Sequence, residues 1–295
     1  MGAQLGSAIA PAPPLRPATP LAPAPAVGVV RGYVDFYRTA MRIAISAQFQ
    51  YRVSNLFFMV GLIAEPIIYL VVWSTIARQQ GGAVGGYTAG QFAAYYIVWT
   101  LVRNMNVWSV GAWDDRIRTG ELSGMLLRPL HPMHWDLGYF AGWKVISIGL
   151  WLPIAVVLAL LFQPDLDPRP IDVVVFAIAI WGAYLVRAVT YSLLGLSAFW
   201  TTRVGPLVQV VMTLELLFSG RLVPLSLMPD WSQALANSLP FKWTFGFPIE
   251  ALVGRLPVSE LLGGLLMQVL WIGLGALAIR AAWAFAVRRY AAVSG

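Results

Sequence analysis

The sequence has no cysteine and few charged residues. Among its 295 residues, 20 are Lys or Arg and 13 are Asp or Glu, so only 11% are charged. That share is about half of what soluble domains carry. The missing cysteines exclude disulfides, thiol catalysis and thiolate metal sites. The shortage of charge accompanies a hydrophobic content of 59% and several long apolar runs, which indicate a membrane protein with several spans.

Motifs for catalysis and nucleotide binding are also missing. The sequence contains no G-x-x-x-x-G-K-[ST] loop, no G-x-S-x-G and no H-E-x-x-H, so we expect no P-loop ATP binding and no catalytic residue in this chain. The two histidines, His131 and His134, form H-P-M-H, which provides too few ligands for a metal site by itself. The net charge of +7 is more typical of basic residues on the cytoplasmic side of a membrane than of nucleic-acid binding.

Two segments precede the apolar part of the chain. Residues 1–30 are rich in Pro and Ala and carry one charged residue, Arg16, which predicts a disordered tail rather than a signal peptide. The segment Arg31–Arg52 has helical periodicity, with a basic face opposite an aromatic face. Such a helix suits the membrane interface, and a cytosolic helix packed on a partner is the alternative.

Six apolar segments follow, and they predict an all-α polytopic membrane domain over residues 31–295. An even number of spans places both termini on one side of the membrane. With the N-terminus inside, thirteen basic residues lie on or near the cytoplasmic side and five lie outside, which favours cytoplasmic termini. The predicted spans are Leu56–Ile76, Gln91–Gly111, Leu137–Phe162, Ile171–Trp200, Val204–Leu225 and Leu261–Arg288.

Four charged residues fall inside the predicted spans: Glu65, Arg103, Arg187 and Glu215. A charge at the bilayer centre costs roughly 2.5–3.5 kcal/mol on insertion scales, so such residues face partners or water. One interpretation is structural ion pairing within the bundle. The other is a polar lining along a substrate path, in which Glu65 or Glu215 receives a cationic substrate.

The connection after the fifth predicted span, Phe218–Pro257, fits neither a span nor an ordinary loop. It contains four prolines, and it is too apolar and aromatic for a solvated connection. Non-helical backbone at membrane depth requires surrounding protein or a water-filled cavity. We therefore expect short re-entrant or interfacial helices here, with "PDWSQALANSL" as one of them.

A polar island at Trp113–Trp135 separates the second and third predicted spans. Within it, Gly120 and Pro129 bound a predicted turn of helix, Glu121–Leu127. A short, stiff segment of this kind can dock on a partner through apolar anchors with charges at the rim, or it can be an ordinary intracellular loop. The candidate contact residues are Glu121, Leu122, Met125, Leu126, Leu127 and Arg128.

The order of these features resembles the permease subunits of ABC-2 type transporters. "FSGRLVPLSLMPDWSQALANSLPFKWTFGFP" is similar to the family's pattern after its fifth span, and "IRTGELSGMLLRPLHP" resembles the cytoplasmic segment of daunorubicin-type and viologen-type exporter permeases. The resemblance covers residues 31 to about 290. It implies that Glu121–Leu127 is a coupling helix, seated in a groove of a separate ATPase subunit.

The resemblance further implies an exporter in the cell membrane that moves a small, cationic or amphiphilic molecule. ATP and Mg²⁺ would bind to the partner ATPase, and a second permease, identical or different, would complete the pathway. Two alternatives stay open: a permease for a lipid-linked polysaccharide, and a non-transporting membrane protein such as an assembly factor. The sequence identifies neither the substrate nor the second permease.

Overall fold

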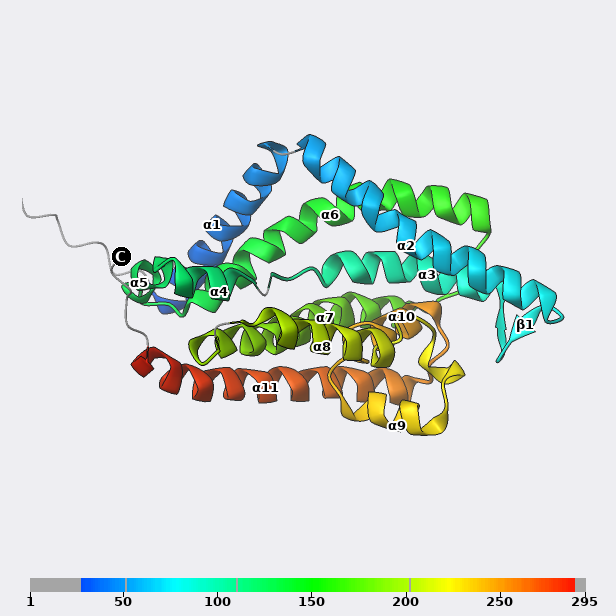
Figure 1. Cartoon of the computed structure of the whole chain (residues 1–295). Coiled ribbons are helices and arrows are strands. Elements are labelled where there is room, and N and C mark those ends of the chain that lie inside the picture. The colour runs from blue at the N-terminus through cyan, green and yellow to red at the C-terminus, as the bar shows by residue number, and fades with distance from the viewer. Residues whose placement is uncertain (1–27, 51, 110, 202, 290–295) are drawn as a thin grey trace, which may run out of the picture.

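The computed structural model is an elongated bundle of α-helices, and it describes residues 28–50, 52–109, 111–201 and 203–289. Most long helices run along the long axis of the bundle (Figure 1). Residues 1–27 of the predicted tail lie outside the described residues, and the first helix already begins at Val29. The long helices are α1 (Val29–Gln50), α2 (Arg52–Gln79), α3 (Ala89–Met105), α6 (Pro132–Phe162), α7 (Pro170–Leu196), α8 (Gly205–Phe218) and α11 (Val258–Arg289).

Short elements gather at the two ends of the bundle (Figure 1). One end carries α4 (Gly111–Arg118) and α5 (Glu121–Leu126), near the end of α11. The other end carries an antiparallel pair of two-residue strands together with α9 and α10. The remaining elements are β1 (Ala83–Val84), β2 (Tyr87–Thr88), η1 (Ser197–Phe199), η2 (Leu225–Leu227), α9 (Asp230–Ser238) and α10 (Gly246–Val253).

Each of the six predicted apolar segments coincides with a helix. Among the described residues, three helices are long and apolar enough to cross a membrane: Pro132–Phe162, Pro170–Phe199 and Val258–Arg288. The apolar helix Gly205–Phe218 is shorter. The second and fifth segments were predicted too long, because α3 ends at Met105 and α8 at Phe218.

The core of the bundle surrounds α3, where 12 of the 17 residues are buried. Aromatic side chains dominate this helix: Phe92, Tyr95, Tyr96 and Trp99 are fully buried. The helix begins with a capping box, in which Thr88 Oγ1 accepts from the backbone N–H of Gln91 and the Gln91 side chain accepts from the N–H of Thr88. It packs against α2, α6 and α10, so Arg103, near its C-terminal end, is held in a rigid frame.

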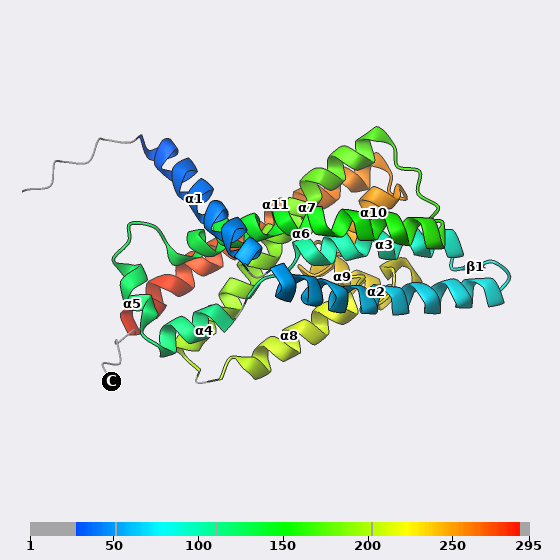
Figure 2. The same ribbon diagram turned by 90° about the horizontal axis from the view of Figure 1, so that it is seen from above.

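The first helix packs against the N-terminal half of α6 and leaves the bundle at an angle (Figure 2). Glycine permits this close contact, since a Cβ at Gly142 would lie 2.5 Å from the Met41 carbonyl oxygen. The α1 face toward α6 contains the buried residues Ala40 and Ala44, while Val34 and Phe49 on α1 are exposed. The predicted helix is confirmed, and its position at the membrane interface stays a prediction.

The connection between α8 and α11 is built from short helices, as predicted. The segment "DWSQALANS" forms α9, and α10 follows it. A sharp turn begins the connection: Gly220 has φ +83°, and a Cβ there would lie 2.9 Å from the Tyr95 hydroxyl. That hydroxyl donates a 2.6 Å hydrogen bond to the Gly220 carbonyl. The turn directs Arg221 back toward the bundle, where it contacts Glu65 of α2.

Candidate functional site

The polar island between α3 and α6 folds into two short helices, α4 and α5. The turn between them ends at Gly120, which has φ +77°, and α5 then runs over Glu121–Leu126. The predicted helical turn at Glu121–Leu127 therefore exists and is one residue shorter than expected. Helix α5 lies at one end of the molecule, beside α4 and near the end of α11 (Figure 1).

The apolar residues of α5 divide between the chain's own core and the surface. Leu122 is fully buried and Met125 is nearly so, in a cluster with Trp113, Leu196 and Ile279. The expectation that all four apolar residues face a partner must be corrected, because these two hold α5 onto its own subunit. Leu126 is partly buried against the same cluster, whereas the exposed fraction of Leu127 is 88%. Glu121, Gly124, Arg128 and Pro129 are also exposed.

Polar contacts fix the same island to the start of α6. Arg116 of α4 donates two hydrogen bonds, of 2.8 and 2.7 Å, to the carboxylate of Asp136. This two-point geometry restrains the orientation of α4 as well as its position. Helix α4, which contacts α5, is thereby tied to α6 through Arg116, while α5 packs on α7 and α11 at Leu196 and Ile279. A force applied to α5 would reach three long helices.

The two histidines of this region have structural contacts. His131 Nδ1 accepts a hydrogen bond from the Met133 N–H and caps α6, while its ring lies 4.2 Å from that of Trp283. Burial, with a smaller contribution from His134, lowers the pKa of His131 to about 4. It is therefore neutral near pH 7, which a hydrogen-bond acceptor at this position requires. His134 is hydrogen-bonded to the Tyr37 hydroxyl of α1 at 2.7 Å.

The intramembrane charges predicted from the sequence form two ionic clusters. In the first, which we call the Glu65 triad, Glu65 of α2 lies between Arg103 of α3 and Arg221. Arg103 Nη1 donates a short hydrogen bond to Glu65 Oε2, and Arg221 Nη2 donates to both carboxylate oxygens at 3.0 and 3.1 Å. Tyr69 Oη adds a donor at 3.1 Å. The exposed fractions of the side chains are 27% for Glu65, 21% for Arg103 and 18% for Arg221.

The second cluster is closed to the surface. Glu215 of α8 accepts short hydrogen bonds from Arg187 Nη1 and from the Tyr191 hydroxyl, both on α7. The exposed fraction of Glu215 is 1%, and that of Arg187 is 8%. The Arg187 guanidinium also lies 4.4 Å from the ring centre of Tyr191. The Glu215–Arg187 pair links α8 to α7, so it fits the interpretation that the charges in the predicted spans form structural ion pairs.

Both acids are thus already neutralised by arginine. Glu215 is enclosed, and Glu65 receives hydrogen bonds from three side chains. The structure does not support the hypothesis that these two carboxylates receive a cationic substrate, because no charge is left over on either. The structure adds Arg221, which follows the end of α8 and was not among the four charged residues found in the predicted spans, to the Glu65 triad.

Lys144 is a further buried cation, which the sequence did not single out. It is fully buried in α6, and its Nζ donates a 2.9 Å hydrogen bond to the carbonyl of Val107. Its Nζ also lies 4.3 Å from the ring centre of Tyr184. Val107 follows the end of α3, where carbonyl groups lose their helical partners. Lys144 therefore stabilises the non-helical stretch between α3 and α4.

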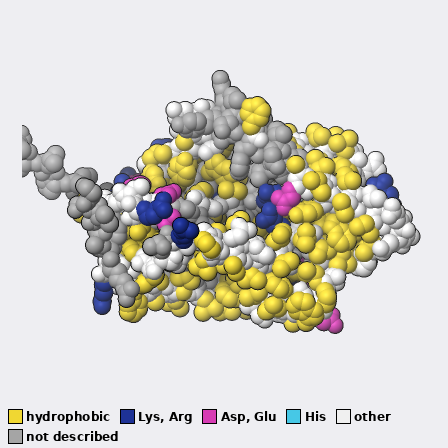
Figure 3. All heavy atoms as spheres, viewed as in Figure 1, with side chains coloured by type: hydrophobic (Ala, Val, Ile, Leu, Met, Phe, Trp, Pro, Cys, Tyr) yellow, Lys and Arg dark blue, Asp and Glu magenta, His cyan; other side chains and the backbone are white. Residues whose placement is uncertain are grey.

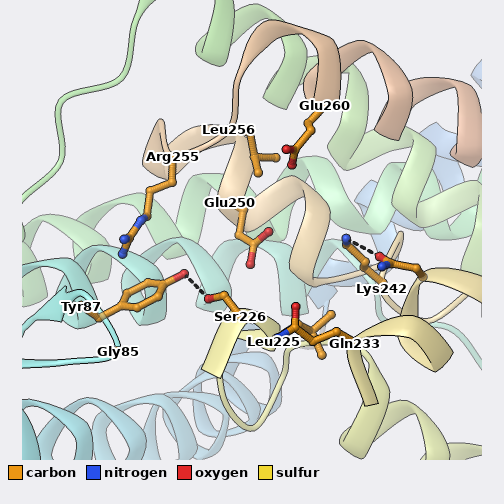
Figure 4. Close-up of a pocket in the computed structure, with 11 residues that line it drawn as sticks. Gly85, Tyr87, Leu225, Ser226, Gln233, Lys242, Glu250, Arg255, Leu256 and Glu260 are labelled. Carbon is orange, nitrogen blue, oxygen red and sulfur yellow. Dashed lines mark hydrogen bonds between the residues drawn. The ribbon is translucent and has the colours of Figure 1, made fainter. Parts of the chain in front are cut away.

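A polar cavity of about 270 Å³ opens at the opposite end from α5, between β2, η2 and α10 (Figure 4). Its cations already have partners: Lys242 Nζ donates to Asn237 Oδ1 at 2.6 Å, and the Arg255 guanidinium lies 3.8 Å from the Tyr87 ring centre. Glu250 points into the cavity and forms no ion pair with the described residues. Burial raises the pKa of Glu250 to about 7, although Lys242 and Arg255 oppose the shift.

Comparison with known proteins places this arrangement in a family. The family model described as "ABC-2 family transporter protein" matches residues 63–294. The match includes α5, both ionic clusters and the short helices after α8, and it begins after α1. No curated protein matches the chain.

Proposed function

Because the chain belongs to the ABC-2 family of transporters, we propose that it is the permease subunit of an ABC exporter for a small amphiphilic molecule. A separate ATPase subunit would bind ATP and Mg²⁺ and drive transport. The chain itself is a membrane transport component, and its helices include three that are long and apolar enough to cross a bilayer. The daunorubicin-type and viologen-type subgroup suggested by the cytoplasmic segment is part of this proposal.

The observation that carries the proposal is the construction of α5. Its inner face is anchored in the chain's own core by Leu122 and Met125, while Leu127 is left almost entirely exposed. An exposed leucine on a firmly attached helical turn can enter an apolar groove of a partner without loss of the turn's own support. The contacts with α6, α7 and α11 would then carry ATPase movement into the long helices.

The proposed membrane arrangement has six spans, formed by α2, α3, α6, α7, α8 and α11, with both termini in the cytoplasm. This orientation puts α5 on the ATPase side and the cavity at Glu250 outside. Helix α8 exposes a row of apolar side chains, including Leu207, Val210, Leu214 and Leu217. The Glu65 triad is partly exposed and includes Arg221, just after the end of α8, and exposed charge is unfavourable against lipid. We propose that a second permease, identical or different, covers this face.

The test is co-purification of the partner ATPase with a Leu127→Asp variant. A buried leucine contributes about 2 kcal/mol, and an aspartate in an apolar groove adds a penalty of a few kcal/mol. We expect ATPase binding to weaken by about 100-fold or more. The variant should still enter the membrane and elute as a single species, because Leu127 supports none of the helices.

Leu166→Asp is the matched control, since Leu166 is an exposed leucine in the connection before α7 at the opposite end of the bundle. It should keep normal ATPase binding. Leu122→Asp is not suitable as a docking test, because it would place a charge in the chain's own core and destabilise α5 itself. Normal ATPase binding by Leu127→Asp would contradict the docking role, and failure to recover any ATPase with the wild type would favour a non-transporting membrane protein.

A further inference from the structure

The Glu65 triad has more positive than negative charge. It contains two guanidinium groups and one carboxylate, so its formal net charge is +1. The carboxylate already accepts hydrogen bonds from Arg103, Arg221 and Tyr69. A cation approaching the triad would meet an acid that is shared by two arginines and would be repelled by the remaining charge. An anion with one negative charge would bring the net charge of the site to zero.

The excess charge lies at the surface of the chain. Figure 3 shows two groups of acidic and basic side chains on one face, one near the middle with hydrophobic side chains beside it and one toward the end that carries α5. The three side chains of the triad are each about one-fifth to one-quarter exposed. An uncompensated charge in an apolar environment is costly, and a ligand that neutralises it gains the corresponding interaction in a medium of low dielectric constant.

Aromatic rings hold the guanidinium groups in place. The ring of Trp99 lies 5.2 Å from the Arg103 guanidinium and 5.8 Å from that of Arg221, and Phe245 lies 6.0 Å from Arg221. Trp99 and Phe245 are buried, so they form a fixed support beneath the two guanidinium groups. A guanidinium fixed in this way loses little freedom on binding, and its geometry matches the oxygen atoms of a carboxylate or phosphate.

We propose that the Glu65 triad binds the anionic group of the transported amphiphile, a phosphate or carboxylate attached to an apolar chain. The apolar surface around the triad would contact the chain of the same molecule. This inference rests on the proposed function, because it places the triad on the transport pathway beside α8. It gives the substrate a sign of charge opposite to the one predicted from Glu65 and Glu215 in the sequence.

The test compares three probes with the same alkyl chain: dodecyl phosphate, dodecylammonium and dodecanol. Binding to the purified full-length permease is measured by native mass spectrometry, and the ATPase rate of the permease–ATPase complex is measured in neutral phosphatidylcholine nanodiscs. We expect dodecyl phosphate to bind at least about tenfold more tightly than dodecylammonium, and to stimulate the ATPase rate more strongly. Inorganic phosphate at the same concentration should not displace dodecyl phosphate, because it lacks the apolar chain.

Two variants change the charge of the triad in opposite directions. Arg221→Gln brings the net charge to zero and should remove most of the preference for phosphate. Glu65→Gln brings it to +2 and should leave dodecyl phosphate binding as tight or tighter, whereas a purely structural ion pair would be damaged by either change. Arg255→Gln is the control, since Arg255 lies in the outer cavity over Tyr87 and should not alter the preference.

Equal or tighter binding of dodecylammonium by the wild type would overturn the proposal, without reference to any variant. Displacement by inorganic phosphate alone would overturn the assignment to an amphiphile. Unchanged phosphate preference in Arg221→Gln, in a protein that elutes as the wild type does, would overturn the role of the triad. Absence of ATP-driven activity with every probe would instead count against the proposed function, and the binding comparison would still decide the charge of the ligand.

Discussion

Replacing Glu215 by glutamine should destabilise the protein strongly, although the two side chains have nearly the same shape. Glu215 is enclosed between α7 and α8 and has Arg187 as its ionic partner. The Glu215→Gln variant leaves the Arg187 guanidinium charged, almost fully buried and without a counter-ion. Removing one member of a buried ion pair costs about 3–5 kcal/mol, chiefly because the other charge stays uncompensated.

The change in thermal stability follows from this free energy. One kcal/mol shifts the midpoint of a chain of this size by about 2–4 °C, so the expected loss is about 10 °C. The double variant Glu215→Gln/Arg187→Gln removes both charges and should recover most of the loss. The measurement is the temperature at which half of the monodisperse size-exclusion peak disappears in detergent.

Glu260→Gln provides the control, because Glu260 is an exposed glutamate at the start of α11 that forms no ion pair with the described residues. It should leave the midpoint unchanged. The reasoning would be refuted if Glu215→Gln stayed within about 2 °C of the wild type, or if the double variant were as unstable as the single one. Either result would mean that the buried charge is compensated by groups other than its partner.

Two further predictions concern pH and membrane orientation. The pKa of Glu250 rises from 4.5 to about 7 on folding, so the folded protein binds more protons than the unfolded chain between these two pH values. The free energy of unfolding should therefore fall by at most about 3 kcal/mol as pH rises through that window. Thermal midpoints measured at intervals across the window should show this fall, and Glu250→Gln should flatten it. The chain has no native cysteine, so a single introduced cysteine reports orientation without background labelling. Ala83→Cys and Asp167→Cys should react with an impermeant reagent added outside intact cells. Gly124→Cys should react only after the membrane is opened. Labelling of Gly124→Cys in intact cells would reverse the proposed orientation.

The positions of the long helices could be predicted because length and apolar content suffice for them. Their ends could not, because side-chain contacts decide where helices stop. At the end of α3, the Asn106 side chain donates to the carbonyls of Val102 and of Thr244, the latter 138 residues later in the chain. At the end of α8, the turn at Gly220 is fixed by the hydroxyl of Tyr95, on a different helix. Neither partner can be identified from local sequence.

The four charged residues within the apolar segments were also found from the sequence, but their pairing was not. Their positions within the predicted spans place Glu65 and Arg103 at membrane depth, but they do not show which base pairs with which acid. The contact between Arg221 and Glu65, which are 156 residues apart in the sequence, depends on the turn that directs Arg221 back toward the bundle. The faces of α5 posed the same problem, because the burial of Leu122 depends on α7 and α11 lying beneath it. Prediction therefore found Glu65 and Arg103, but not Arg221, which gives the Glu65 triad its excess positive charge.

The shortness of α8 has a consequence for the surrounding lipid. Its 14 residues span about 21 Å, whereas the hydrocarbon core of a bilayer is about 30 Å thick. Lipid beside an element with too little apolar length thins locally rather than leaving its tails exposed to polar groups. Helix α8 ends three residues before Arg221, which belongs to the Glu65 triad. We therefore expect a dimple in the membrane at this place, where the polar head of a lipid-like molecule has the shortest distance to travel between the two leaflets.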